Sequence, residues 1–246
     1  MKKFILTATL LLMQAVSFAQ YTNYQFFENF LQKYVDDNGK VNYKKINTNK
    51  VDLDKVVARF EDLKPKENWS KNEKLAYWIN AYNAFSIKLI IDHYPLKSIL
   101  DIDKAWKINF INIEGSKISL DDIDYRILKK LNDPRIHFAI NCASYSCPSL
   151  KNRAFYPDTI ENELEEAAFA FLNDAERNKI SKKEAKISKL FDWFAADFTS
   201  QTDLVSFINQ YSKVKINDKT KISFLDYNWN LNGVEAPVKE LGVAIN

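Results

Sequence analysis

The sequence predicts an α+β fold in which helices pack around a small antiparallel sheet. Several long segments carry apolar side chains at helical spacing, and the helix predicted at 71–93 is apolar nearly all round. Shorter segments alternate in pairs around turn residues, as β-hairpins do. No low-complexity or Pro/Gly-rich linker divides the chain, so we expect a single domain over 20–246.

Residues 1–19 are expected to be a secretory signal peptide that precedes this fold. A basic start, Lys2-Lys3, leads into the apolar run 4–16, and a small-x-small ending predicts cleavage after Ala19. The alternative is an anchor that stays attached, but the run is short for a span of about 20 residues. No later run is long enough. We therefore expect a periplasmic or secreted protein with no stable membrane span after cleavage.

Charge and composition exclude several function classes. Removal of the signal peptide lowers the formal charge from +3 to about +1, because that segment holds two lysines and no acids. A nearly neutral protein has no electrostatic reason to bind nucleic acid. Four glycines in the chain and no Gly-rich loop argue against a phosphate cradle. Two cysteines in a Cys-x4-Cys arrangement do not match a zinc finger, so no metal or cofactor is predicted, and nothing predicts an oligomeric state.

The first elements of the fold are expected to be two amphipathic helices, at 23–35 and 51–63. Both place apolar residues at helical spacing. Turn residues 36–39 end the first helix, and Pro65 follows the second. A short strand is expected between them at 41–43.

The helix predicted at 71–93 is the strongest in the chain. Ser70 and Glu73 form a capping box ahead of it, and Pro95 closes it. Its apolar residues lie on every side: Leu75, Trp78, Ile79, Tyr82, Phe85, Leu89 and Ile90. A helix with apolar residues on all sides is expected to be buried inside the protein.

Two amides interrupt this apolar helix. Asn80 and Asn83 are three residues apart and so lie on one face. A buried amide must find hydrogen-bond partners or it destabilises the fold. Two roles are open: the amides clamp the backbone of a neighbouring loop, or they line a pocket and orient a catalytic group.

The rest of the chain is predicted to mix hairpins with short helices. A hairpin is expected over 106–120 around Gly115, after which Ser119 and Asp122 cap a helix that runs to about Leu131. The elements expected after the break at Asp133-Pro134 are a strand at 135–141, an ordered loop at 143–150, a helix at 159–172, a hairpin at 179–188, helices at 189–198 and 203–211, and strands at 214–216 and 222–229.

The segment 135–148 holds both cysteines and one of the two histidines. In a strand, alternation places His137 and Asn141 on one face and Cys142 on the other, apolar face. Cys147 lies beyond a small polar turn that can bring it back beside His137. A thiolate nucleophile needs a nearby base or cation, and His137 is the natural base. The alternatives are a satisfied core histidine and a Cys142–Cys147 disulfide, which exported proteins commonly form.

Five segments of the chain form a recognisable series: LAYWINAYNAFSIKLIIDHYP (75–95), SLDDIDYRIL (119–128), DPRIHFAINCASYSCP (133–148), KLFDWFAADF (189–198) and LDYNWNLN (225–232). In this order they resemble the family named domain of unknown function 547. The resemblance implies a papain and transglutaminase-like thiol-hydrolase architecture, with a central helix packed on an antiparallel sheet. Family members often carry an acidic residue followed by histidine where this chain has Asp124-Tyr125.

These observations lead to two functional hypotheses. The first is an exported thiol-dependent hydrolase or acyl transferase that acts on an amide or thioester in a peptide or cell-envelope polymer. In it, Cys142 or Cys147 is the nucleophile, His137 is the base, and Asn80 orients the base or stabilises an oxyanion. The predicted catalytic residues are Cys142, Cys147, His137 and Asn80, and the predicted binding residues are Asn83 and Asn141. The second is a non-catalytic periplasmic binding module with a Cys142–Cys147 disulfide.

Overall fold

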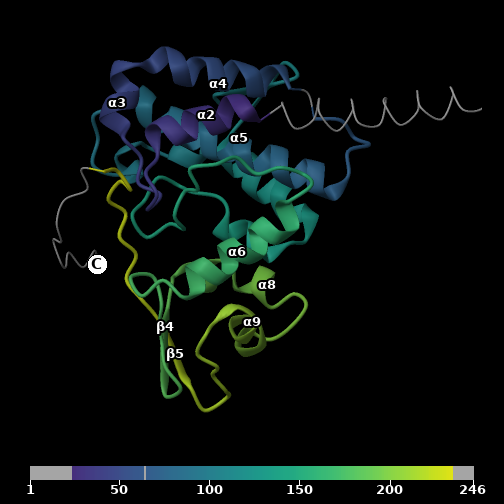
Figure 1. The fold of residues 1–246 in the computed structure, drawn as a ribbon, viewed down its shortest axis with the longest axis vertical. Coiled ribbons are helices and arrows are strands. Elements are labelled where there is room, and N and C mark those ends of the chain that lie inside the picture. Colours follow the sequence, from purple (N-terminus) through teal and green to yellow (C-terminus); the bar gives the residue numbers. More distant parts are fainter. Residues whose placement is uncertain (1–23, 64, 235–246) are drawn as a thin grey trace, which may run out of the picture.

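A computed structural model describes residues 24–63 and 65–234 and confirms the α+β class (Figure 1). The predicted signal peptide, 1–19, lies outside these residues. Helices make up about half of the described chain, and two small sheets lie beside them. Among the described helices, none is both long and apolar enough to cross a membrane.

Helices form one side of the molecule (Figure 1). They are α2 (Gln25–Tyr34), α3 (Tyr43–Thr48), α4 (Lys50–Asp62) and α5 (Lys71–Asp92). The strand predicted at 41–43 is wrong, because only Val41 makes β-bridges there. Asn42 instead caps α3, since its side-chain oxygen accepts a hydrogen bond from the Lys45 backbone N–H.

The central helix α5 confirms the prediction for 71–93. Ser70 and Glu73 cap each other's backbone N–H groups in the expected box. The helix packs against α3, α4, α6 (Ile160–Leu172) and the π-helix η3 (Asp122–Leu128). The resemblance implied a central helix packed on an antiparallel sheet, whereas the principal neighbours of α5 are helices. The papain-like architecture is therefore not confirmed.

Two small sheets complete the β part. The strands are β1 (Ile111–Ile113), β2 (Ser116–Ile118), β3 (Lys179–Ile180), β4 (Glu184–Ile187) and β5 (Lys221–Phe224). Strands β1 and β2 pair antiparallel, as do β3 and β4, but β5 joins β4 in parallel. The sheets are thus not all antiparallel. The strand predicted at 214–216 is wrong, because the Asn209 side chain binds both the N–H and the C=O of Ile216.

Short helical turns fill the middle of the chain. They are η1 (Ile99–Asp101), η2 (Ala105–Lys107), the π-helix η3 (Asp122–Leu128), η4 (Lys129–Leu131) and η5 (Pro134–Phe138). The strand predicted at 135–141 is wrong, and η5 takes its place. Asp133 caps this turn by accepting from the Arg135 N–H, and Pro134 occupies the first helical position, where its missing N–H costs nothing.

The second half of the fold packs around α6 (Figure 1). Its helices are α6 (Ile160–Leu172), α7 (Leu190–Trp193), α8 (Ala195–Phe198) and α9 (Leu204–Tyr211). The core divides into two apolar clusters, one around α2, α4 and α5 and one around α6 to α9. Ile136 belongs to the first cluster and Phe138 to the second. His137 therefore lies on η5 where the two clusters meet.

Candidate functional site

A cavity of about 250 Å³ lies where these clusters meet. It is bounded by α5, η2, η3, η5, the 140–148 loop, α7 and the segment after β5. Its walls combine aromatic rings, two carboxyls, one histidine and both cysteines. The lining residues are Tyr82, Trp106, Asp121, Asp124, Tyr125, His137, Ile140, Cys142, Cys147, Pro148, Leu190, Trp193, Phe194, Tyr227 and Trp229.

His137 is held in one orientation. Its Nε2 atom lies 2.8 Å from Asp197 Oδ2, and the imidazole stacks on the Phe194 ring with centroids 3.9 Å apart. Asp197 also accepts from Lys129 Nζ at 3.2 Å. The hydrogen bond from His137 and then the one from Lys129 hold the pKa of Asp197 below its usual value. Because Asp197 is thus an ionised acceptor, Nε2 of His137 must donate, and only Nδ1 is left to act as a base.

The two cysteines form a disulfide, so neither sulfur is a thiol in this structure. Two hydroxyls lie against the sulfur pair. Ser144 Oγ is 3.1 Å from Cys142 Sγ, and Tyr227 Oη is 3.2 Å from Cys147 Sγ. The two hydroxyl oxygens are themselves 3.1 Å apart. Burial raises the pKa of Tyr227 to about 12, so its phenol keeps its proton at neutral pH.

Among the described residues, Asp124 is the one buried carboxyl that lines this cavity with an unpaired oxygen. Asp124 belongs to η3 and is only 6% exposed. Within the described residues, its Oδ1 atom has no hydrogen-bond partner. Burial is the main cause that raises the pKa of this carboxyl to about 6, while the nearby His137 and Lys129 act to lower it. A buried polar atom without a partner is rare and needs an explanation, such as a ligand.

Aromatic side chains form a continuous wall of the cavity. The Tyr227 and Trp229 rings lie 4.5 Å apart, and Trp193 stacks on Trp229 at 5.5 Å. Trp106 also packs edge-on against Trp229, with ring centroids 5.8 Å apart. Two of the lining aromatics remain open to solvent, Trp193 at 45% and Tyr125 at 51% exposure. Such a wall offers flat apolar surface to a ligand that enters from outside.

The structure brings three of the predicted site residues together. His137, Cys142 and Cys147 line one cavity, although strand alternation had placed His137 and Cys142 on opposite faces. That alternation does not exist, because residues 134–138 are helical. Asn80 lies elsewhere: its amide donates to Phe155 O at 2.8 Å and accepts from Phe155 N at 2.9 Å.

The remaining two predicted residues support the loop that carries the disulfide. Asn83 donates to Ala139 O at 3.0 Å and accepts from the Asn141 N–H at 2.8 Å. Asn141 donates to Pro148 O and accepts from the Ala143 N–H, so its side chain bridges the base of the loop. Both amides are buried and neither lines the cavity described above. They fix where the disulfide lies.

Sequence reasoning missed several residues at this site. Asp124, Asp197, Tyr227 and Trp229 were not predicted as site residues, yet each lines the cavity or holds a residue that does. They lie in segments quoted for the family resemblance, which was the only available signal. No local spacing joins Asp197 to His137, 60 positions apart. Among the described residues, no cluster of three or more His, Cys, Asp or Glu is placed to hold a metal ion.

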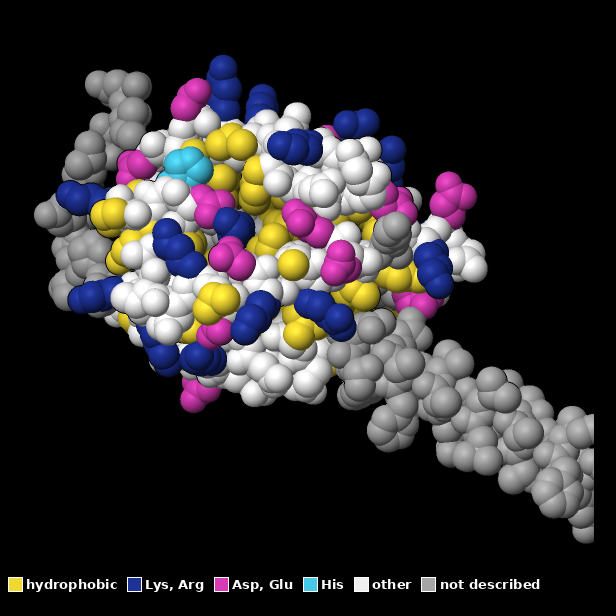
Figure 2. All heavy atoms as spheres, turned by 90° about the horizontal axis from the view of Figure 1, so that it is seen from above, with side chains coloured by type: hydrophobic (Ala, Val, Ile, Leu, Met, Phe, Trp, Pro, Cys, Tyr) yellow, Lys and Arg dark blue, Asp and Glu magenta, His cyan; other side chains and the backbone are white. Residues whose placement is uncertain are grey.

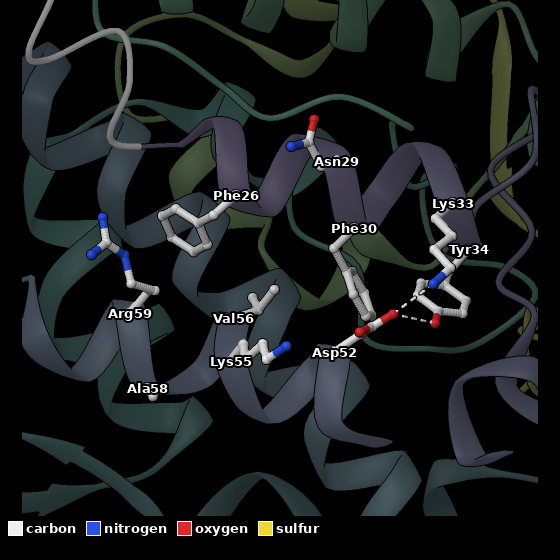
Figure 3. Close-up of a pocket in the computed structure, with 10 residues that line it drawn as sticks. All are labelled: Phe26, Asn29, Phe30, Lys33, Tyr34, Asp52, Lys55, Val56, Ala58 and Arg59. Atoms are coloured by element: carbon white, nitrogen blue, oxygen red, sulfur yellow. Dashed lines mark hydrogen bonds and ion pairs between the residues drawn. The ribbon is translucent and has the colours of Figure 1, made fainter. Parts of the chain in front are cut away.

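A larger groove of about 660 Å³ lies between α2 and α4 (Figure 3). Seen from this side of the molecule, apolar surface is interspersed with basic and acidic side chains (Figure 2). Its polar groups are largely paired: Lys33 Nζ and Tyr34 Oη both donate to Asp52 Oδ2 at 2.7 Å, and Arg59 lies over the Phe26 ring. No predicted site residue lines it. We therefore place the candidate site at the smaller cavity.

Comparison with known proteins gives one match. Residues 66–172 match the family model described as "Protein of unknown function, DUF547". This segment includes α5, η3, η5, the disulfide loop and α6. No curated protein and no solved structure matches the chain. The segment that carries most of the cavity lining is thus similar to the DUF547 family of proteins of unknown function.

Proposed function

We propose that this protein is a binding module for a small ligand, and that the cavity between Asp124 and the disulfide is its binding site. The observation that carries the proposal is the unpaired Oδ1 atom of Asp124 in an otherwise aromatic cavity. Ligand pockets are typically apolar with a few placed polar groups. A ligand that donates a hydrogen bond to this oxygen would satisfy the only buried carboxyl oxygen that lacks a partner in the described residues.

In this proposal the disulfide is a structural part of the pocket. It closes the loop that runs from Cys142 to Cys147, and Arg177 holds the same loop by donating to Cys147 O at 2.7 Å and to Tyr145 O at 3.1 Å. A pocket wall fixed in this way is organised before the ligand arrives, which reduces the entropy lost on binding. We also propose export to the periplasm or beyond, which agrees with a disulfide because oxidising compartments preserve such bonds.

The first test is the thiol state of protein purified from the periplasm. Intact mass, measured after iodoacetamide treatment without reductant, should show no added label. Reduction under denaturing conditions before labelling should add two labels. A thiol that reacts under native conditions without reductant would count against a structural disulfide.

The second test is occupancy of the cavity. Trp106, Trp193 and Trp229 all line it, so their fluorescence should respond to a small ligand. A panel of five- to eight-carbon amines, alcohols and carboxylic acids is titrated against the oxidised protein. Saturable changes that are lost on Trp229→Ala, in a variant that keeps its circular dichroism spectrum, support binding in this cavity. If no member of the panel binds, the proposal is wrong for ligands of this size.

A second candidate function is a thiol-dependent hydrolase or acyl transferase acting on an amide or thioester of a peptide or envelope polymer. The specific observation in its favour is that His137 and both sulfurs line the same cavity. The chemistry requires reduction of the disulfide by two electrons and two protons from an external dithiol. Activity towards thioester and amide substrates that appears only with reductant, and is lost in Cys142→Ala or Cys147→Ala, would replace the binding proposal with this one.

A further inference from the structure

The charges around the cavity indicate the chemistry of its ligand. The lining residues that the structure describes include two carboxyls, Asp121 and Asp124, and no lysine or arginine. Lys129 lies nearby, but its ammonium is paired with Asp197 at 3.2 Å and packs over the Tyr125 ring. The lining therefore favours a cation over an anion.

The unpaired oxygen of Asp124 further restricts the chemical class of the ligand. Asp124 Oδ1 is an acceptor when the carboxyl is ionised, so the ligand must carry an N–H or O–H donor. A quaternary ammonium has no such hydrogen. A protonated primary or secondary amine supplies both the positive charge and the donor, and a charged hydrogen bond is stronger than a neutral one.

The aromatic wall suits the same ligand. Trp and Tyr faces attract a cation through the ring quadrupole and also pack against alkyl chains. Trp106, Tyr227 and Trp229 form a continuous set of rings beside the carboxyls. A cavity of about 250 Å³ holds a short alkyl chain rather than a large molecule.

We propose that the cavity binds an alkylammonium group, with its nitrogen on Asp124 Oδ1 and its chain against the Trp106–Tyr227–Trp229 wall. This inference rests on the proposed binding function and specifies its ligand class. The same chemistry occurs in a free alkylamine and in a lysine side chain of a peptide. The exposed edges at Tyr125 and Trp193 leave the cavity open to either source.

The test compares three ligands of matched length. The oxidised full chain is titrated at pH 7.5 with n-pentylamine, n-pentanol and pentanoate, using tryptophan fluorescence and calorimetry. The amine should bind at least about tenfold more tightly than the alcohol, and pentanoate should bind most weakly. Nα-acetyl-lysine N-methylamide distinguishes the sources: binding at least as tight as that of pentylamine indicates a lysine side chain, and weaker binding indicates a free amine.

Two variants test whether the preference for the amine depends on the Asp124 carboxyl. Asp124→Asn should weaken pentylamine at least about tenfold and leave pentanol nearly unchanged, because an amide oxygen still accepts a hydrogen bond but carries no charge. Asp192→Asn is the matched control. It removes an exposed carboxylate beside Trp193 that pairs with Lys189 at 3.2 Å and does not line the cavity. It should change neither affinity.

A measurement on the unmodified chain covers the case in which Asp124→Asn does not fold. The titratable and charged groups around Asp124 are Tyr82, Asp121, Tyr125, Lys129, His137 and Asp197. Pentylamine affinity should fall between pH 7.5 and pH 5 as Asp124 gains its proton, while pentanol affinity should stay constant. Equal affinities for amine and alcohol, or an amine affinity that does not change with pH, would overturn the alkylammonium inference. Saturable binding of pentanol or pentanoate in that case would leave the binding function standing.

Discussion

The buried amide of Asn80 offers the sharpest test of what holds the core together. Asn80 is fully buried on α5, and its side chain binds both the N–H and the C=O of Phe155, a residue 75 positions away in sequence. Asn80→Leu keeps a similar volume but removes both partners. Each buried backbone group left without a hydrogen bond costs about 1–3 kcal/mol. The variant should therefore lose about 4 kcal/mol of unfolding free energy.

Urea denaturation followed by far-UV circular dichroism measures this loss. With a slope of about 2 kcal/mol per molar urea, the midpoint should fall by about 2 M. Ser86→Ala is the matched control, because Ser86 lies on the same buried helix and its hydroxyl has no partner among the described residues. Its stability should change by less than about 0.5 kcal/mol or rise. If Asn80→Leu costs less than about 1 kcal/mol, or no more than Ser86→Ala, the clamp does not stabilise the fold.

Three further predictions test the pocket and the backbone. Burial raises the pKa of Asp124 from 3.8 to about 6, so the folded chain holds this proton more tightly than the unfolded chain does. The contribution of the protonated carboxyl to the free energy of unfolding is therefore complete below pH 4 and is lost as pH rises through 6. Relative to Asp124→Asn, the wild type should lose on the order of 3 kcal/mol between pH 4 and pH 7 in urea titrations. Replacing Cys142 and Cys147 by Ala should cost about 2 kcal/mol, since the closed loop is short; a loss near zero would mean that the bond constrains little. Both Gly39 and Gly115 have positive φ, but only at Gly39 would an added Cβ meet backbone atoms, at 2.8 Å. Gly39→Ala should therefore lower the free energy of unfolding by more than about 2 kcal/mol, and Gly115→Ala by only about 1 kcal/mol. Equal thermal shifts would contradict that difference.

Local pattern was sufficient wherever neighbours in sequence determine the structure. The capping box at Ser70 and Glu73 and the all-round apolar surface predicted α5 nearly to the residue. The turn at Gly115 likewise predicted the β1–β2 hairpin, although the strands are shorter than expected. The burial predicted for Asn80 and Asn83 implied that both amides need hydrogen-bond partners, but it did not identify them. Of the two open roles, the geometry matches the backbone clamp.

Local pattern failed where a cap overrode alternation. Residues 135–141 alternate like a strand, but Asp133 and Pro134 begin a 3₁₀ turn, which commits the backbone before side-chain periodicity can act. The wrong strand prediction placed His137 and Cys142 on opposite faces, although both line the same cavity. The parallel pairing of β5 with β4 was also beyond local reasoning, since it joins strands more than 30 residues apart through α7, α8 and α9.

The site itself depends on contacts that no short window of sequence contains. His137 is fixed by Asp197 from α8, and the disulfide is covered by Tyr227 from the segment after β5. That segment runs beside the disulfide loop because the Tyr145 and Ser146 N–H groups donate to Asn230 O and Asn228 O. The same crossing brings Tyr227 and Trp229 into the cavity that Asp124 lines. A carboxyl on a π-helix thus shares a cavity with a segment about 100 residues downstream, and π-helices are frequent at functional sites. This arrangement leaves a destabilising buried carboxyl in the folded state, which a ligand that donates to Oδ1 would relieve.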